Sequence, residues 1–137
     1  IGLFLDASVS FKHLDTLASL DARTVLIHAK TVDRQNESDS DLINYCGEKR
    51  YVFVTEDKRV RMDPYKVEII KNAGIGFIEV RFNNATFLTK DGVYRRNIES
   101  LLELAKHPIP YCISMNKDGF RFVPRDDLFT GRTSNRS

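Results

Sequence analysis

Two apolar stretches of this sequence end in a carboxylate, and these ends are the first candidates for chemistry. The stretch 51–55 runs directly into Glu56 and Asp57, and the stretch 1–5 runs into Asp6. Short apolar runs rich in β-branched and aromatic residues are typical of buried parallel strands. Ligands of open α/β sheets bind at the carboxyl ends of such strands. We therefore expect Asp6 and Asp57 to share one acidic site, with the Thr55 hydroxyl beside them.

A third carboxylate, Asp39, stands at the predicted start of a helix. Clustered carboxylates repel one another, so their joint ionisation requires a cation or raised pKa values. A hard divalent ion such as Mg²⁺ prefers oxygen ligands, and it can activate water and stabilise charge on a phosphoryl oxygen. Asp6, Asp39 and Asp57 are therefore predicted metal ligands, with Thr55 orienting Asp57 or a metal-bound water. An Asp at a helix start is also an ordinary cap, and both interpretations of Asp39 stay open.

Basic residues are expected around the same edge, on the loops and first turns that follow the strands. Contacts between such cations and RNA phosphates supply affinity without sequence preference. A solvated charged surface explains the same residues equally well. The candidates for phosphate contacts are Lys12, Lys58, Arg59 and Arg61.

Histidine, tyrosine and cysteine give weaker indications. The three histidines are dispersed, so we assign them no metal or acid–base role and expect surface or helix-end positions. They are His13, His28 and His107. Tyr65 and Tyr94 could stack on bases, although packing in the core or at its rim is the favoured interpretation. Cys46 and Cys112 are too few and too scattered for a zinc cage, and we expect buried thiols of a cytosolic protein.

The elements that must position these residues follow from the hydrophobic pattern. Strands are predicted at 1–5, 24–28, 51–55 and 76–80, and helices at 11–20, 38–47 and 63–73. This alternation predicts right-handed crossovers and a central, mainly parallel sheet between two helical layers, an α/β fold of three α-β-α layers. A hairpin over 111–123, turning at 116–119, is predicted at the sheet edge.

The stretches between these elements are harder to assign. The basic segment 58–62 is predicted to be a loop, and 81–94 has no clear pattern beyond a turn at 90–92. A helix is predicted around 98–105, because apolar residues recur there at helical spacing before Pro108 stops the chain.

Length and composition favour one globular domain over 1–124, followed by a basic, flexible tail at 125–137. The chain has 137 residues, 42% hydrophobic and 29% charged, with a net charge of +2. Nothing approaches the ~20 apolar residues of a membrane span, and no signal peptide pattern opens the sequence. We therefore expect a cytoplasmic protein with no membrane partner. So small a net charge does not by itself indicate a nucleic-acid binder.

The ordered set of motifs resembles a known family. Asp6 followed by a turn and a helix, the helix opening 38–43, and the strand end 54–58 are similar to the PIN-domain ribonucleases, specifically the short PIN-like proteins related to VapC-type toxins. The likeness runs over 1–80, and 110–114 is more weakly similar to the end of those proteins. The resemblance implies a Mg²⁺- or Mn²⁺-dependent endoribonuclease that acts on RNA. It also implies the toxin half of a toxin–antitoxin pair, with an antitoxin partner and self-association into a homodimer.

Carried over to this chain, the resemblance assigns Asp6, Asp39 and Asp57 as the acidic metal ligands and Thr55 as the hydroxyl residue before the last of them. This chain has Ser8 where many short relatives have Asn. Candidates for the fourth acidic residue of longer PIN domains are Asp41 and Asp63.

Other functions are also compatible with the chain. A degenerate site would make the protein a non-catalytic module that binds nucleic acid or a partner protein. A phospho-acceptor receiver domain has similar length and element order, but it pairs two acidic residues after the first strand, where this chain has Asp6 alone. No Asp-x-Asp-x-Thr follows that strand either, which argues against a haloacid-dehalogenase-type phosphatase.

Overall fold

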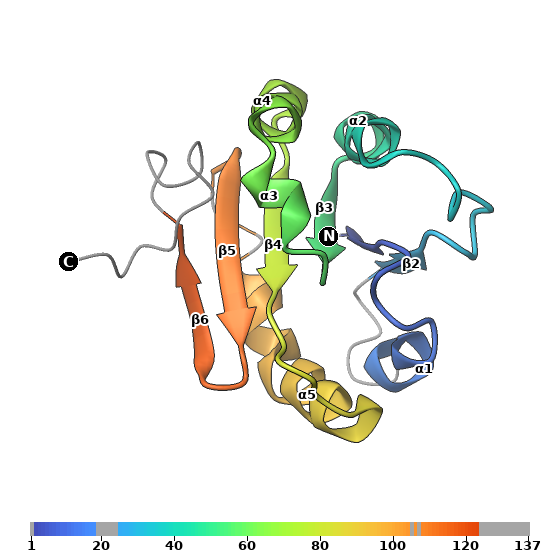
Figure 1. The fold of residues 1–137 in the computed structure, drawn as a ribbon, viewed down its shortest axis with the longest axis vertical. Helices are drawn as coiled ribbons and strands as arrows, with labels where there is room; N and C mark the ends of the chain where they lie inside the picture. Colours follow the sequence, from blue (N-terminus) through green and yellow to red (C-terminus); the bar gives the residue numbers. More distant parts are fainter. Residues whose placement is uncertain (1, 19–24, 105, 107, 124–137) are drawn as a thin grey trace.

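A single mixed sheet organises the protein in the computed structural model, which describes residues 2–18, 25–104, 106 and 108–123. In these residues the sheet has six strands in the order β2-β1-β3-β4-β5-β6 (Figure 1). The strands are β1 (Gly2–Leu5), β2 (Val25–His28), β3 (Tyr51–Thr55), β4 (Gly76–Val80), β5 (Tyr111–Asn116) and β6 (Gly119–Phe122). All neighbouring pairs are parallel except β5 and β6, which form the predicted antiparallel hairpin at the edge.

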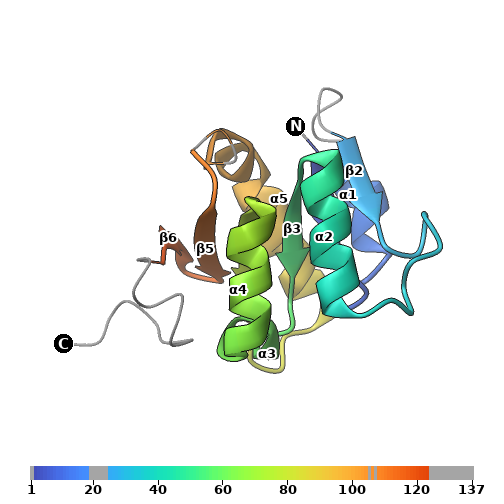
Figure 2. The same ribbon diagram turned by 90° about the horizontal axis from the view of Figure 1, so that it is seen from above.

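Helices cover both faces of this sheet, as the alternation of elements predicts. They are α1 (His13–Ala18), α2 (Asp39–Lys49), α3 (Arg59–Met62), α4 (Pro64–Ala73) and α5 (Phe87–Leu104). Figure 2 shows α2 and α4 on one face and α1 and α5 on the other. The predicted three-layer α/β architecture with a mainly parallel sheet and an edge hairpin is therefore confirmed.

Successive side chains of each strand enter opposite cores, because their directions alternate along a strand. Phe4, Phe53 and Phe77 are paired across β1, β3 and β4 and stack below α2 and α4. Leu3 and Leu5, next to Phe4 in sequence, belong to the second core under α5. Burial on both faces explains why these strands are continuously apolar.

The two helices that flank the site, α2 and α4, begin at capping side chains, and α4 ends at a left-handed glycine. The Ser38 hydroxyl accepts from the Asp41 N–H at 3.1 Å at the start of α2, so Ser38 is the cap. Asp63 caps α4 by accepting from the Tyr65 N–H at 2.9 Å, and Gly74 ends α4 with φ of 65°. These caps follow from residue type, because Ser and Asp side chains accept from the free N–H groups of a first turn and Pro64 suits the first helical position.

Two predicted irregular segments are wrong, because tertiary contacts make them helical. Residues 59–62 form α3, a single turn rather than a loop. The turn expected at 90–92 lies inside α5, whose residues Lys90 and Tyr94 both reach Glu56 at 2.9 and 2.7 Å. Residues four apart lie on the same face of a helix. The two contacts with Glu56 therefore stabilise the helical conformation across Gly92.

The boundaries of other predicted helices differ from the expectation. The first helix begins at His13 rather than Phe11, and its predicted end lies outside the described residues. The helix expected around 98–105 is the last part of α5, which ends at Leu104. The tail 125–137 lies outside the described residues as well.

Surface or helix-end positions were expected for the histidines, and His13 does begin α1, but neither His13 nor His28 lies at the surface. His28 is 3% exposed and binds the Val9 carbonyl oxygen at 2.7 Å through Nε2. His13 is fully buried and stacks on Phe87, with ring centroids 4.4 Å apart. His107 lies outside the described residues. Each imidazole is buried because a neighbouring element offers it a polar partner, which spacing along the sequence does not show.

Both cysteines are buried as predicted, and burial is the main cause that raises the pKa of each thiol to about 12. Tyr94 belongs to the core, whereas Tyr65 on α4 is 70% exposed. In the described part of the chain, no helix has the length and apolar character needed to cross a membrane.

Candidate active site at the carboxyl edge of the sheet

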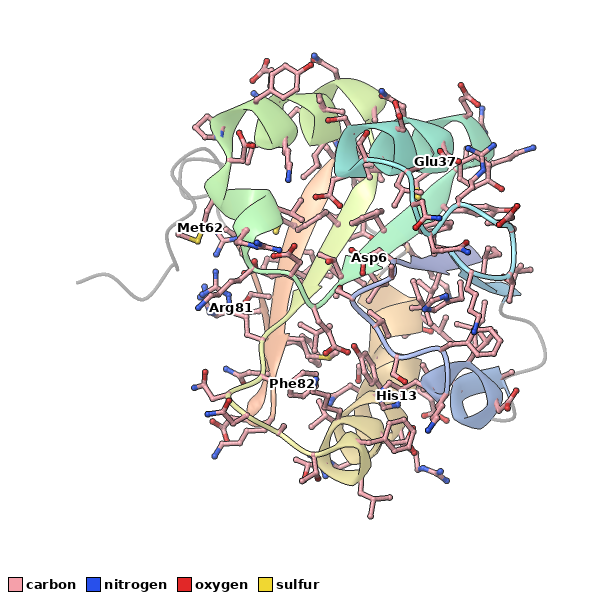
Figure 3. All side chains as sticks on the ribbon, turned by 45° about the vertical axis from the view of Figure 1, so that its right-hand side comes forward. Asp6, His13, Glu37, Met62, Arg81 and Phe82 are labelled. Carbon is pink, nitrogen blue, oxygen red and sulfur yellow. The ribbon has the colours of Figure 1, made fainter. Side chains whose placement is uncertain are left out.

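Asp6 is the centre of the carboxyl edge of the sheet (Figure 3). It directly follows β1 and is only 4% exposed. Because β1 and β3 are paired with Leu5 opposite Val54, the next residues, Asp6 and Thr55, lie side by side. The Thr55 hydroxyl donates to Asp6 Oδ2 at 2.6 Å. The backbone N–H of Ser8 donates to Asp6 Oδ1 at 3.0 Å, and the Ser8 hydroxyl donates to the same oxygen.

The pKa of Asp6 is raised, and desolvation by burial is the largest cause. Hydrogen bonds from Ser8 and Thr55 lower it, and the negative charge of Asp39 raises it further. Among the described residues, no basic side chain forms an ion pair with Asp6. Asp6 is therefore a buried carboxylate held by two hydroxyl groups and one backbone N–H, with no cationic partner among the described residues.

The two hydroxyl groups also join the loop after β1 to the loop after β3. Thr55 Oγ1 accepts from the Asp57 N–H at 3.0 Å and lies 3.1 Å from Ser8 Oγ. Ser8 Oγ accepts from the Glu56 N–H at 2.8 Å. Thr55 and Ser8 therefore fix the backbone at Glu56 and Asp57 relative to Asp6. A role of Thr55 in orienting a metal ligand or a metal-bound water stays a prediction.

The carboxylate of Asp57 is held by a nearby guanidinium. Its Oδ1 accepts from the Arg59 N–H at 2.9 Å and from Arg59 Nε at 3.0 Å, and its Oδ2 accepts from Arg59 Nη2 at 3.0 Å. The hydrogen bond from the Arg59 side chain is the main cause that lowers the pKa of Asp57. The charge of Asp57 is therefore compensated by Arg59, whereas Asp6 has no such partner among the described residues.

Asp39 is similarly neutralised, by a lysine on α4. Lys66 Nζ donates to Asp39 Oδ2 at 2.8 Å, and this hydrogen bond is the main cause that raises the pKa of Lys66. The charge of Asp57 also raises the pKa of Lys66, and the charge of Asp39 acts on Asp6. The fold thus brings Asp6, Asp39 and Asp57 within one electrostatic neighbourhood. Asp41 is exposed in the first turn of α2.

The donor types at this edge match Mg²⁺ or Mn²⁺, because all three side chains offer carboxylate oxygens. Within the described ranges, however, no three His, Cys, Asp or Glu side chains are grouped so that they could hold a metal ion. Lys66 and Arg59 take the places beside Asp39 and Asp57 that such an ion would share. The carboxylate oxygens therefore fit a divalent ion chemically. Binding of the ion requires Lys66 and Arg59 to move away from Asp39 and Asp57.

The predicted phosphate contacts do not share one environment. Lys12 and Lys58 are exposed, and the Arg59 side chain is 81% exposed while paired with Asp57. The expectation is wrong for Arg61, which is 1% exposed and lies 2.9 Å from Glu79. Its inward direction follows from α3, because one helical turn directs successive side chains to different sides.

Sequence reasoning missed the contacts of Glu56 with α5 and of Lys66 with Asp39 at this edge. Glu56 links the edge to α5 by accepting from Lys90 and Tyr94, and burial and the Glu56 charge raise the pKa of Tyr94. The spacing of Lys90 and Tyr94 was a usable signal, hidden by the wrong turn assignment. Lys66 had no local signal, since only the packing of α4 beside α2 brings it to Asp39.

A cavity of about 520 Å³ adjoins Asp57 and extends toward the ends of β4 and β5. It is lined by Glu56, Asp57, Lys58, Arg59, Arg81, Phe82, Asn83 and Asn116. Basic, aromatic and amide side chains thus lie directly next to the acidic edge. No protein family, curated protein or solved structure matches the chain. Its function must therefore be inferred from the residues of this edge.

Proposed function

We propose that this protein is a Mg²⁺- or Mn²⁺-dependent endoribonuclease whose ion is held by Asp6, Asp39 and Asp57. The observation that carries the proposal is Asp6, a buried carboxylate with a raised pKa and, among the described residues, no cationic partner. A divalent cation beside it would offset the desolvation of its charge and the repulsion from Asp39. A buried carboxylate without a counter-charge lowers the stability of the fold, and such destabilising groups occur at functional sites.

The chain's own residues prepare this chemistry. Ser8 and Thr55 hold both oxygens of Asp6 and fix the backbone of Asp57. When bound, the ion supplies a water of lowered pKa and stabilises charge on the phosphoryl oxygens. The Arg59 side chain is exposed enough to turn from Asp57 toward a substrate phosphate. A guanidinium forms the same bidentate pair of hydrogen bonds with a phosphate as with a carboxylate.

Cleavage of a labelled single-stranded RNA in Mn²⁺ or Mg²⁺ tests the proposal. We expect the native chain to cleave and Asp6→Asn and Asp57→Asn to lose at least about 100-fold in rate, beyond the 10–100-fold typical of residues that only support a ligand. Asp39→Asn is compared with Asp41→Asn, which removes an exposed carboxylate from the same helical turn. Equal cleavage by the native chain and all these variants would refute the assigned site.

A second function is favoured by the neutralised carboxylates. Because Lys66 and Arg59 already pair with Asp39 and Asp57, the edge could bind nucleic acid or a partner protein without a metal. Titration with Mn²⁺ by calorimetry separates the two functions. Binding of RNA without uptake of Mn²⁺ would support the non-catalytic module.

The resemblance to short PIN-like toxins extends the proposal to a toxin under the control of a protein antitoxin. A ribonuclease of this kind, expressed alone in a bacterial host, inhibits growth by degrading RNA. We expect the native chain to arrest growth and Asp6→Asn to leave it unaffected. Equal growth inhibition by both proteins would contradict the toxin assignment.

A further inference from the structure

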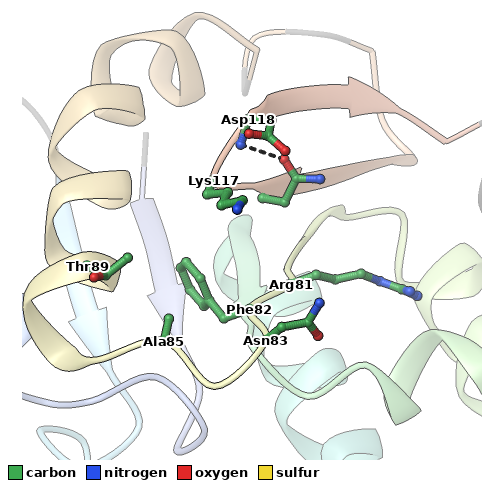
Figure 4. A pocket seen from close by; sticks show the side chains of 8 residues that line it. Arg81, Phe82, Asn83, Ala85, Thr89, Lys117 and Asp118 are labelled. Atoms are coloured by element: carbon green, nitrogen blue, oxygen red, sulfur yellow. Dashed lines mark hydrogen bonds between the residues drawn. The ribbon is translucent and has the colours of Figure 1, made fainter.

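Two cavities follow the carboxyl ends of β4 and β5 and share one wall. The first, of about 520 Å³, reaches Asp57, and the second, of about 330 Å³, reaches the β5–β6 hairpin. Both volumes lie in the range of ligand-binding pockets, ~300–1,000 Å³. The shared wall consists of Arg81, Phe82, Asn83 and Asn116. Figure 4 shows the second cavity, with Phe82 between Thr89 and Lys117. We call the two cavities together the distal groove.

The fold fixes the wall of the distal groove. The Arg81 N–H donates to the Met115 carbonyl oxygen at 2.8 Å, which continues the pairing of β4 and β5 past the end of β4. Arg81 Nε donates to the buried Glu79 at 3.2 Å. Asn116 Oδ1 accepts from the Asp118 N–H at 2.8 Å, so the hairpin turn orients its amide and leaves the NH₂ group as a donor.

Phe82 is supported from two sides. Its ring packs edge-on against Tyr94, with centroids 6.0 Å apart, and Lys90 Nζ lies 5.3 Å from its centroid. Both supporting residues are themselves tied to Glu56 at the acidic edge. The Phe82 ring is thus half-buried against the second core, and its neighbours in the sequence are Arg81 and Asn83.

The charges of the distal groove favour an anionic occupant. Of its acidic residues, Glu56 and Asp57 are paired with Lys90 and Arg59. Three further charged residues that line it, Lys58, Lys117 and Asp118, form no ion pair with any described residue. Positive charge therefore exceeds negative charge among these three side chains, which favours phosphate groups along this path.

We propose that the distal groove binds a nucleotide of single-stranded RNA adjacent to the scissile phosphate. Phe82 stacks on the base, Arg81 contacts a phosphate, and the Asn83 and Asn116 amides hydrogen-bond the base edge. The inference rests on the proposed ribonuclease function and deepens it by naming the substrate class. Stacking on a protein ring requires an unpaired base, so the groove selects single-stranded RNA over duplex RNA.

The test measures binding of two short fluorescein-labelled probes in EDTA, where cleavage cannot occur. One is a single-stranded oligoadenylate, and the other is a ribose-phosphate oligomer of the same length without bases. We expect Phe82→Leu to weaken oligoadenylate binding at least about fivefold, because one stacked base contributes roughly a fivefold to hundredfold change in affinity. Binding of the base-free oligomer should not change in Phe82→Leu, because this oligomer has no base that could stack on Phe82. Removing the ring and removing the bases eliminate the same contact.

Phe11→Leu is the matched control. Phe11 is a partly exposed phenylalanine outside the distal groove, and Lys30 Nζ lies 5.1 Å from its ring centroid, as Lys90 lies near Phe82. We expect no difference between this variant and the native chain. An equal loss in both variants, or an equal loss with both probes, would overturn the inference.

Two further measurements keep the inference testable. Asn83 is exposed, so Asn83→Ala carries little folding risk, and it should weaken oligoadenylate but not the base-free oligomer. Duplex RNA that binds as tightly as the single strand would overturn the groove's assignment. Base-dependent binding without any cleavage would refute the ribonuclease function and leave this inference standing. Cleavage by a native chain that does not distinguish the two probes would refute this inference alone.

Discussion

Two buried carboxylates on this sheet have opposite surroundings. Glu79 on β4 is 1% exposed and lies between two guanidinium groups, Arg61 at 2.9 Å and Arg81 at 3.2 Å. Asp6 after β1 is 4% exposed and is held by the hydroxyl groups of Ser8 and Thr55. The two residues are almost equally buried, so burial alone does not distinguish a structural carboxylate from a candidate ligand.

The difference lies in where the compensating charge comes from. A buried charge is tolerated when its counter-charge is part of the fold, as it is for Glu79. For Asp6 burial raises the pKa, and none of the described basic side chains compensates it. A carboxylate left in that state suits a cation that arrives from solution. Four substitutions test this difference between Glu79 and Asp6.

Glu79→Gln should have the largest effect. It leaves the Arg61 guanidinium buried without its carboxylate, and breaking a buried pair in this way costs about 3–5 kcal/mol of the free energy of unfolding. Denaturant unfolding measures the change, with Glu99→Gln on the exposed side of α5 as the control. A loss below about 1 kcal/mol would show that Glu79 is not a structural counter-charge.

Thr55→Val should have the next largest effect. Valine keeps the shape but removes the donor to Asp6 and the acceptor for the Asp57 N–H. We expect RNA cleavage to fall about 10–100-fold, as for residues that orient a metal ligand. Thr31→Val, in the exposed loop after β2, should cleave at the native rate. Native activity in Thr55→Val would remove Thr55 from the site.

Asp6→Asn should change stability in the opposite direction to Glu79→Gln. The folded-state pKa of Asp6 is raised, so the native state loses stability as pH rises from the ordinary carboxyl pKa through the raised value. The variant should therefore be at least as stable as the native chain at neutral pH, and this advantage should disappear in acid. Thermal unfolding against pH measures it. Added Mn²⁺ should raise the melting temperature of the native chain but not of Asp6→Asn.

Arg59→Gln should have the smallest effect. The pair that it removes is solvent-exposed, and such pairs rarely change an equilibrium by more than about fivefold. Freed of Arg59, Asp57 should bind Mn²⁺ up to about fivefold more tightly by calorimetry. Arg34→Gln, which removes the ion pair with Glu37 elsewhere on the surface, should leave Mn²⁺ affinity unchanged. Weaker Mn²⁺ binding in Arg59→Gln would mean that Arg59 does not compete with the ion.

Local signals were enough to predict much of this protein. The strands, the Ser38 and Asp63 caps, the end of α4 at Gly74 and the edge hairpin all follow from residue types within a few positions. The convergence of Asp6, Thr55 and Asp57 was also predictable, because parallel neighbouring strands must end at one edge.

The wrong predictions share one cause. The turn at 90–92 and the loop at 58–62 became helical through partners far along the chain, Glu56 and Glu79. Arg61 was expected to contact phosphate from the surface, yet it meets the buried Glu79, and His13, although it begins a helix as one alternative expected, is buried against Asp91. Such partners lie beyond any window of local sequence.

The order of the elements and the places of the three carboxylates at their ends could be predicted from the sequence, because they depend on hydrophobic period and short-range hydrogen bonds. How the charge of each carboxylate is compensated depends on tertiary contacts. Lys66 reaches Asp39 through helix packing, whereas Asp6 receives hydroxyl groups and, among the described residues, no cation. Electrostatic energy depends on distance in space and on burial, and neither quantity can be read along the chain.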